Sequence, residues 1–488
     1  MIAGAKALAR GYRLTVTALA LAPALAIAEP QAQSRTYDPA LADQHQFAQL
    51  DDTIPGSAEA RQVLARALAF DAMIYGTTAV LQYRQMYQQA VDRNDPDFTG
   101  FNAFAHDRAL AGPGYKAFKT PNADTLYSNA WLDLRDGPVL FDVPDTAGRY
   151  FTANFLDIHG NATNISARTH GTDGGRFLIA TTDWQGEVPE GTTLFRVATP
   201  FTWILLRVLV QEAKGDLPLA NALQDRFRLS PVAKGAPPAS FPDGDDQSAA
   251  GFMRILDFVL RTCGHPLRED ALVYRFGAIG IAGNRKVDDV LADPAILSGI
   301  EQGFADAQTV IKASMGQNGK RVGAWSQPRD VGRYGFNYLY RAAVTTLGTG
   351  GNVIDENHPA TSFVDATGAR LDGALSDYRL VLSPPPPARF FWSVTVYDAA
   401  TRELYPNALG RYMAGDRTPG LKRGKDGSVT VLFSHQPEAL GKSPNVLPVP
   451  AGPFYVAIRA QGPEAAMKSG EWRPPAIEKL PDGKASRK

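Results

Sequence analysis

The sequence predicts an α+β protein, mainly β with helical insertions. Between about residues 126 and 197 apolar and polar residues alternate, and Gly, Pro and Asp clusters interrupt the pattern about every ten residues, which is typical of an antiparallel sandwich or barrel. A second strand-like segment, opening with FFWSVTVYD at 390–398, follows the proline run 384–387. Before and between these segments apolar residues recur every three or four positions, as in helices.

The chain begins with a segment that has the features of an export signal. Lys6, Arg10 and Arg13 precede an apolar run at 14–27, and Ala26-Ile27-Ala28 is a small-x-small cleavage site. We therefore predict a signal peptide at 1–28 and a periplasmic or secreted mature chain. The run is shorter than the roughly 20 residues of a spanning helix, so no membrane insertion is expected after signal removal; an uncleaved signal acting as an anchor is the alternative.

Composition narrows the range of partners. The 488 residues include 50 basic and 50 acidic ones, and removal of the signal leaves 47 basic residues and a net charge of −3. This balance does not indicate nucleic-acid binding. The one cysteine, Cys263, lies in the apolar stretch MRILDFVLRTC, which favours a buried, inert thiol over a nucleophile.

The elements follow in a clear order, starting with a polar linker at 29–57. Residues 58–93 have helical periodicity and predict one long or two short helices, so 58–230 is expected to hold a helical segment and the first β domain. Helical patterns dominate 231–350, together with a Pro- and Gly-rich loop near 230–248 that is predicted to be a connection or a lid. The second β domain is expected at 351–488.

Two clusters of polar residues lie at the ends of predicted strands. KTPNADTLYS at 119–128 places Asn122, Asp124, Thr125 and Tyr127 at the start of a strand, where ordinary turn chemistry is the simpler explanation. In RYFTANFLDIHGNATN, Asp157 is two residues from the histidine at 159 and could orient it, raise its pKa and leave a group that shuttles protons. The alternative is that this segment forms the solvated face of an antiparallel sheet.

Several common chemistries have no motif here. The sequence has no Gly-x-Ser-x-Gly, His-Glu-x-x-His or Gly-x-x-x-x-Gly-Lys-Ser/Thr element and no cysteine pair. No cofactor is predicted, and the metal content stays unknown. A divalent cation bound by Asp124, Asp157 and amide oxygens is left open as an alternative.

The motifs taken together resemble a bacterial family of exported proteins. Residues 119–164, KTPNADTLYSNAWLDLRDGPVLFDVPDTAGRYFTANFLDIHGNATN, resemble the domain of unknown function 1254. The later stretch that begins DYRLVLSPPPPARFFWSVTVYD at residue 377 resembles the domain of unknown function 1214. The resemblance implies two β-sandwich domains, of a jelly-roll or nucleoplasmin-like kind, with helices packed between and around them.

The resemblance also implies which residues form a site. The family pattern recurs at Asn122, Asp124, Thr125, Tyr127, Arg149, Asp157 and Asn164, and in the second domain at Trp392 and Arg411. Many members carry Tyr where this chain has His159, so Asp124 and Asp157 rank above His159 as candidate catalytic groups.

Our functional hypothesis is an exported enzyme, a hydrolase or lyase of catabolism, that acts on a small organic molecule by acid–base chemistry without a redox cofactor. Its expected catalytic residues are Asp124 as the base, Tyr127 as a proton donor or oxyanion partner, Asp157 and His159. Its expected substrate-binding residues are Asn122, Thr125, Arg149, Asn164, Arg168, Trp392 and Arg411. The alternative is a ligand-binding or scaffolding β-sandwich protein without catalysis; a homo-oligomer is compatible with either.

Overall fold

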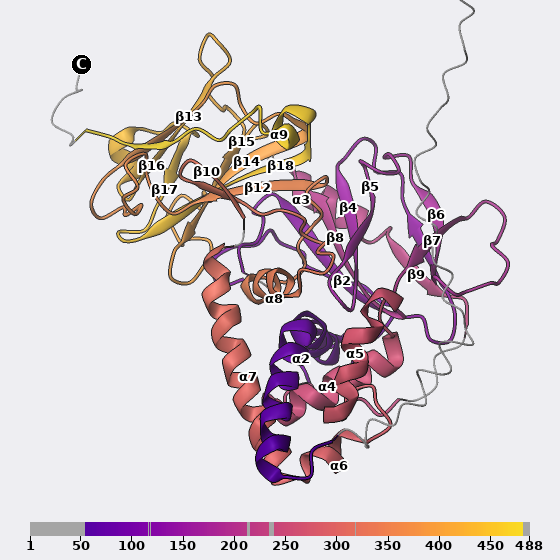
Figure 1. The fold of residues 1–488 in the computed structure, drawn as a ribbon. Helices are drawn as coiled ribbons and strands as arrows, with labels where there is room; N and C mark the ends of the chain where they lie inside the picture. The colour runs from indigo at the N-terminus through magenta and orange to yellow at the C-terminus, as the bar shows by residue number, and fades with distance from the viewer. Residues whose placement is uncertain are drawn as a thin grey trace, which may run out of the picture. The chain divides into compact units, whose positions relative to one another are not determined.

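A computed structural model of the protein describes residues 54–481, apart from residues 116, 118, 212–214, 234–238 and 318. The predicted signal peptide and most of the predicted linker, up to residue 53, lie outside the described residues. The described part contains eight α-helices and nineteen strands in four sheets (Figure 1). The predicted α+β class with two β-sandwiches is confirmed.

The first sandwich is made of two sheets, A and B. In spatial order, sheet A contains β1 (Ala105–His106), β2 (Thr125–Asp133), β8 (Phe201–Leu209), β4 (Phe151–Asp157) and β5 (Ala162–Ser166). Sheet B contains β7 (Thr193–Val197), β6 (Gly175–Thr181), β3 (Val139–Val143) and β9 (Arg228–Pro231). Their inner faces meet in one apolar core around Phe141, Phe155 and Ile204.

Strand β8 explains why sheet A has two covered faces. All nine of its residues are buried, and the alternation of a strand sends neighbouring side chains to opposite faces. Ile204 and Leu206 enter the sandwich core, whereas Trp203 and Leu205 pack into a second core formed with the helices. The nearly continuous apolar sequence of β8 is therefore typical of a strand that is covered on both faces.

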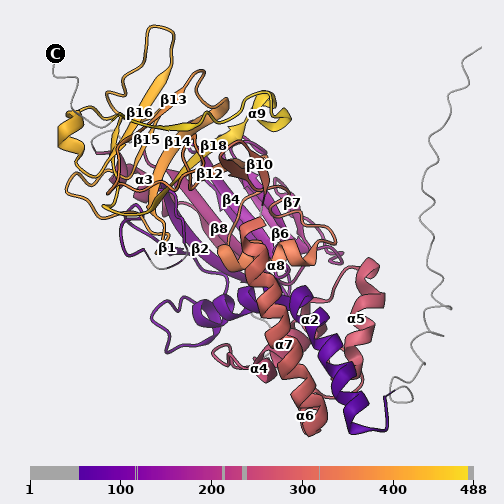
Figure 2. The same cartoon turned by 60° about the vertical axis from the view of Figure 1, so that its left-hand side comes forward.

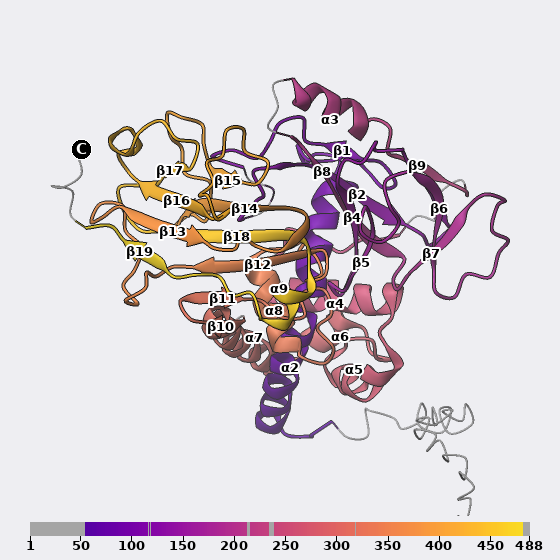
Figure 3. The same cartoon turned by 90° about the horizontal axis from the view of Figure 1, so that it is seen from above.

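The second sandwich repeats this arrangement with sheets C and D. Sheet C contains β10 (Lys320–Val322), β11 (Trp325–Gln327), β12 (Asn357–Ser362), β18 (Phe454–Pro463), β14 (Ala388–Asp398) and β15 (Met413–Gly415). Sheet D contains β17 (Val446–Pro448), β16 (Val429–Ser434), β13 (Tyr378–Leu382) and β19 (Ile477–Lys479), and Figure 3 shows it beside sheet C. The predicted connecting region at 231–350 thus contributes two strands, β10 and β11, to the second sandwich.

Six α-helices form a layer of their own: α2 (Ala58–Met86), continued by the π-helical turn η2 (Tyr87–Val91), α4 (Ala249–Cys263), α5 (Asp270–Phe276), α6 (Val287–Leu291), α7 (Pro294–Ser314) and α8 (Tyr338–Leu347). The other two, α3 (Asp216–Gln224) and α9 (Ala465–Ser469), pack against the first and the second sandwich respectively. Short 3₁₀ turns are η3 (Leu267–Glu269), η4 (Gly277–Ile279), η5 (Met315–Gln317) and η6 (Pro437–Leu440). Figure 2 shows α2 and α7 packed along each other.

Helix α2 is the central element of this layer. The hydroxyl of Ser57 accepts a hydrogen bond from the N–H of Ala60 and caps the first turn, where Glu59 is also favoured. Among the described residues, 58–91 is the helical stretch that is long and apolar enough to cross a membrane by composition, but 61% of its most apolar window is buried inside the protein. This burial is typical of a core helix.

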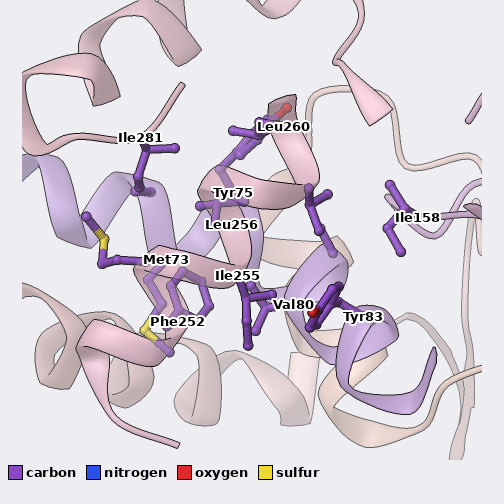
Figure 4. Packing of buried hydrophobic residues seen from close by; sticks show 14 of the residues in the cluster. Met73, Tyr75, Val80, Tyr83, Ile158, Phe252, Ile255, Leu256, Leu260 and Ile281 are labelled. Carbon is purple, nitrogen blue, oxygen red and sulfur yellow. The ribbon is translucent and has the colours of Figure 1, made fainter. Parts of the chain in front are cut away.

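The helical layer covers one end of the outer face of sheet A. Leu256 of α4 packs against α2 so closely that a Cβ on Gly76 would lie 2.6 Å from it. Figure 4 shows Ile255 of α4 near Val80 of α2, with Ile158 of the β4–β5 turn at the edge of the same core. This packing anchors the β4–β5 turn against the helices.

Candidate functional site

A cleft of about 930 Å³ opens between the first sandwich and the helical layer. Its walls come from the β4–β5 turn, the C-terminal end of α4, the η3 turn, the loop before β8 and the start of the α8 segment. Its polar lining includes Arg135, Asp157, His159, Asn161, Asp183, His265, Arg268, Glu269 and Arg341. The volume lies within the range of small-molecule pockets, which is about 300–1,000 Å³.

The β4–β5 turn is held together by Asp157. One carboxylate oxygen accepts hydrogen bonds from the backbone N–H groups of His159 and Asn161, both at 2.9 Å, and the other accepts the Asn161 side-chain amide. Gly160 completes the turn at φ +86°, and a Cβ there would lie 2.6 Å from Thr78 of α2. Asp157 therefore positions His159 through the backbone, and its imidazole has another partner.

That partner determines which ring nitrogen carries the proton. Nε2 of His159 lies 3.1 Å from the carbonyl oxygen of Gly264, and because a carbonyl only accepts, Nε2 is the donor. Burial lowers the pKa of His159, and the nearby Asp157 carboxylate opposes this only in part, so the ring is neutral at neutral pH. Nδ1 is then a free acceptor, buried and without a hydrogen-bond partner among the described residues.

Beside His159 lies a compact group of buried polar side chains. The Tyr75 ring is 6.3 Å from the imidazole, and its hydroxyl donates to Glu269 at 2.7 Å. A second phenol, Tyr338, donates to the other oxygen of Glu269 at 3.1 Å. The Arg341 guanidinium stacks on both rings, at 5.3 and 5.1 Å, and donates to the backbone carbonyl of Tyr75. The lining of the cleft therefore includes a carboxylate and a guanidinium, and two phenols outside the lining contact them.

The rim of the cleft is partly apolar and carries charges of both signs, with Asp183 and Arg268 both exposed. Arg268 is exposed and forms no ion pair with any described residue, unlike Arg135, which pairs with Asp133. Phe336, 61% exposed, adds an aromatic surface to the same cleft. Cys263 also lines it, but burial raises the pKa of its thiol to about 12, which agrees with the inert role predicted for it.

Asp124 lies in a different part of the fold. In sheet A, β8 lies between β2 and β4, with Asp124 next to Val210 at one end of β8 and Asp157 opposite Thr202 at the other. At about 3.3 Å per residue, these ends are roughly 26 Å apart. The prediction that Asp124 and Asp157 share a pocket or a cation is wrong, because β2 and β4 both run antiparallel to β8 and so have their starts at the same end.

Asp124 instead belongs to a buried layer between the two sandwiches, which we call the seam. The seam is formed by the outer faces of sheets A and C, with Asp124, Tyr127 and Arg207 on one side and Ser393 and Arg459 on the other. Burial raises the pKa of Asp124, and the Arg459 charge opposes the shift. The hydroxyl of Ser393 in the second sandwich faces the Asp124 carboxylate and also opposes the rise in its pKa.

The NADTLYS motif makes both local and long-range bonds. The N–H of Asn122 donates to the Tyr127 hydroxyl at 2.8 Å, and the Asn122 amide donates to Thr125 at 3.4 Å. Just before it, the carbonyl of Pro121 accepts a hydrogen bond from Tyr397 of the second sandwich at 2.6 Å. The turn explanation is therefore correct as far as it goes, but the turn also joins the two sandwiches.

The other predicted site residues are distributed over the fold. Asn164 donates to Asn352 at 2.8 Å, and Arg168 pairs with the fully buried Glu356 at 2.7 Å; both interactions lie in the seam. The remaining three lie in neither the seam nor the cleft lining: Arg149 forms a two-bond pair with Asp216, Trp392 packs inside the second sandwich, and Arg411 donates to the carbonyls of Ser443 and Val446.

Sequence reasoning missed Glu269, Arg268 and Arg341, which line the cleft, and Tyr75, which binds Glu269 from outside the lining. Arg341 carries the clearest signal, because it recurs with Ala342 and Thr345 on the buried face of α8, where a charge needs a partner. No group of three or more His, Cys, Asp or Glu side chains suited to a metal occurs among the described residues.

Comparisons with known proteins agree with this architecture. The family model described as protein of unknown function DUF1254 matches residues 101–231, and that described as protein of unknown function DUF1214 matches residues 356–465. The comparison with curated proteins found no match.

Two solved structures are similar to the chain. The crystal structure of the VPA0106 protein from Vibrio parahaemolyticus is 28% identical, with a TM-score of 0.68 over 86% of this chain and 100% of that one. A protein from Burkholderia cenocepacia, 12% identical over 91% of this chain and 98% of that one, has a TM-score of 0.41. The chain therefore carries a DUF1254 domain followed by a DUF1214 domain, in the order that the sequence predicted.

Proposed function

We propose that the protein is an enzyme that acts on a small organic molecule in the cleft by acid–base chemistry. The observation that carries the proposal is His159, whose proton is held on Nε2 by Gly264 while Nδ1 keeps a free lone pair. A neutral imidazole with one nitrogen oriented and the other free is a suitable general base. His159 therefore takes the role that the sequence had suggested for Asp124.

The rim of the cleft supports a substrate with an anionic group and an apolar part. Arg268 has no acidic partner among the described residues, so its guanidinium is available to a carboxylate. Phe336 offers an exposed ring for the apolar part. The reaction class that fits these groups is hydrolysis or elimination, because neither requires a redox cofactor.

The proposal is tested by incubating the purified protein with mixtures of small carboxylic acids and esters and following each compound by mass spectrometry. For a compound that is consumed, His159→Gln is expected to lower kcat by about 10²–10⁴-fold, since glutamine can donate to Gly264 but cannot act as a base. Arg268→Ala is expected to raise KM with little change in kcat. Arg226→Ala, an exposed arginine outside the cleft, is the control.

Full turnover by the folded His159→Gln variant would refute the assignment of the base. If Arg226→Ala and Arg268→Ala raised KM equally, the anion-binding role of Arg268 would be refuted. Folding of each variant is checked by its thermal unfolding profile.

A second candidate function is ligand binding without catalysis. The observation that favours it is that Nδ1 of His159 is covered in this structure, whereas a base must reach its substrate. A compound that raises the melting temperature without being consumed would support the binding protein, and consumption would support the enzyme.

We also propose that the mature chain acts in the periplasm or outside the cell. Support comes from the basic and apolar start of the sequence and from Ala26-Ile27-Ala28. N-terminal sequencing of the fractionated protein is expected to begin near Glu29. A cytosolic full-length chain would contradict the proposal.

A further inference from the structure

A second hollow, independent of the cleft, lies on the second sandwich. This groove of about 390 Å³ is formed by the β10–β11 hairpin, the residues that follow it, the start of β12 and the α9 segment. Figure 3 shows α9 beside these strands. The volume is at the lower end of the range for small-ligand pockets.

The charged residues that line the groove are all cationic. They are Lys320, Arg321, Arg329, Lys468 and Arg473, and all five are exposed. A local excess of this kind is notable in a chain whose 50 basic and 50 acidic residues balance. Like charges gathered in one concave surface repel one another and attract an anion.

Among the described residues, Lys468 is the one cation of the groove that lies beside a carboxylate. Lys468 lies 3.5 Å from Asp355, which also pairs with Arg333 at 2.9 Å. Lys320 and Arg321 form no ion pair with any described residue, and Arg473 donates to the backbone carbonyl of Gly470. Most of the positive charge therefore remains available to a ligand.

The floor of the groove adds a polar group and an apolar surface. His358 lines the groove, is only 8% exposed, and has a buried Nδ1 without a hydrogen-bond partner among the described residues. Met467 and Trp472, both buried, form the apolar part. A ligand that fits has a compact anionic group for the rim and a carbon skeleton for the floor.

We propose that this groove binds an organic phosphate that carries at least two negative charges. Arginine guanidinium groups match phosphate oxygens in two-bond geometry, and three arginines with two lysines at one rim exceed what a single carboxylate needs. The phosphate belongs either to a soluble ester or to a lipid headgroup, which share this chemistry.

The test uses pyrophosphate as the soluble probe, measured by isothermal titration calorimetry at low and high salt. Lys320→Glu/Arg321→Glu is expected to weaken binding by about a hundredfold, because it removes two charge-assisted bonds and each is worth about one factor of ten. The control, Lys422→Glu/Lys425→Glu, makes the same change in net charge on exposed residues outside the groove and is expected to bind as the wild type does.

A second arm identifies the source of the phosphate. Phosphatidylcholine vesicles with and without phosphatidic acid are sedimented with the wild-type protein and both double variants. Saturable pyrophosphate binding that depends on the groove supports a soluble ester, and groove-dependent binding to phosphatidic acid vesicles alone supports a lipid headgroup. Absence of both, or equal losses in the groove and control variants, would overturn the proposal.

Discussion

The close approach between α2 and α7 allows one stability prediction to be worked out in detail. Gly299 and Gly303 lie one turn apart on α7 and face α2. A Cβ added at Gly303 would lie 2.3 Å from the carbonyl oxygen of Arg66 and 2.9 Å from the N–H nitrogen of Phe70. These atoms belong to the backbone, so no side-chain rotation can relieve the contact.

The magnitude follows from two opposing effects. Overpacking a well-packed contact costs about 1–3 kcal/mol, and here the helices must separate by about 1 Å, which also weakens the apolar contacts around the glycine. Replacing glycine by alanine inside a helix recovers about 1 kcal/mol. Because the rigid backbone contact places the cost at or above the upper end of its range, we expect Gly303→Ala to lower the free energy of unfolding by about 2 kcal/mol or more.

Urea unfolding followed by circular dichroism measures this change. The matched control is Gly316→Ala, where an added Cβ meets no atom within 4 Å, and its free energy of unfolding is expected to stay within about 0.5 kcal/mol of the wild type. If Gly303→Ala unfolds at the same urea concentration as the control or at a higher one, the inferred α2–α7 contact is refuted.

Three further predictions concern titratable groups. Asp124→Asn is expected to raise the free energy of unfolding at pH ~7 and to leave it unchanged below pH ~4. The reason is that burial raises the pKa of this carboxyl, so the wild-type protein loses stability as the carboxyl ionises. Urea unfolding at both pH values checks this, and a lower free energy of unfolding at pH ~7 would contradict it. Cys263 is expected to resist a chromogenic disulfide reagent at about pH 8 until guanidinium unfolds the chain, since its thiol pKa is raised to about 12; rapid reaction of the native protein would contradict that expectation. Arg149→Met is expected to lower the free energy of unfolding in urea by about 3 kcal/mol, because it leaves the carboxylate of Asp216 without its two-bond partner. The double variant Arg149→Met/Asp216→Leu should regain most of this loss. Equal stability of the single and double variants would argue against the ion pair.

Much of the fold could be predicted from local patterns. The helical periodicity at 58–93 corresponds to α2 and η2, and the alternating segments correspond to the strands of both sandwiches. The strands at 320–327 were missed because each has only three residues, too few to establish an alternating pattern.

The candidate site was harder to predict, because alternation identifies the face of a residue and not its neighbours in the sheet. Asp124 and Asp157 both border strands of sheet A, yet β8, which follows them in sequence, lies between those strands. Their distance depends on this strand order. Asp157 was the expected neighbour of Asp124 within the first domain. In the structure the charged neighbour of Asp124 is Arg459, more than 300 residues further along the chain.

The sequence by itself determined the class of the protein, its two β-rich domains, its family resemblance and the turn chemistry around Asn122. These features depend on local periodicity and on bonds between residues a few positions apart. Only the tertiary structure decided that His159 lies beside Tyr75 and Glu269 in a cleft, and that Asp124 is buried in the seam. The physical reason is that burial and electrostatic environment arise from elements distant in sequence, and these elements set the pKa of each group and the access of a ligand to it.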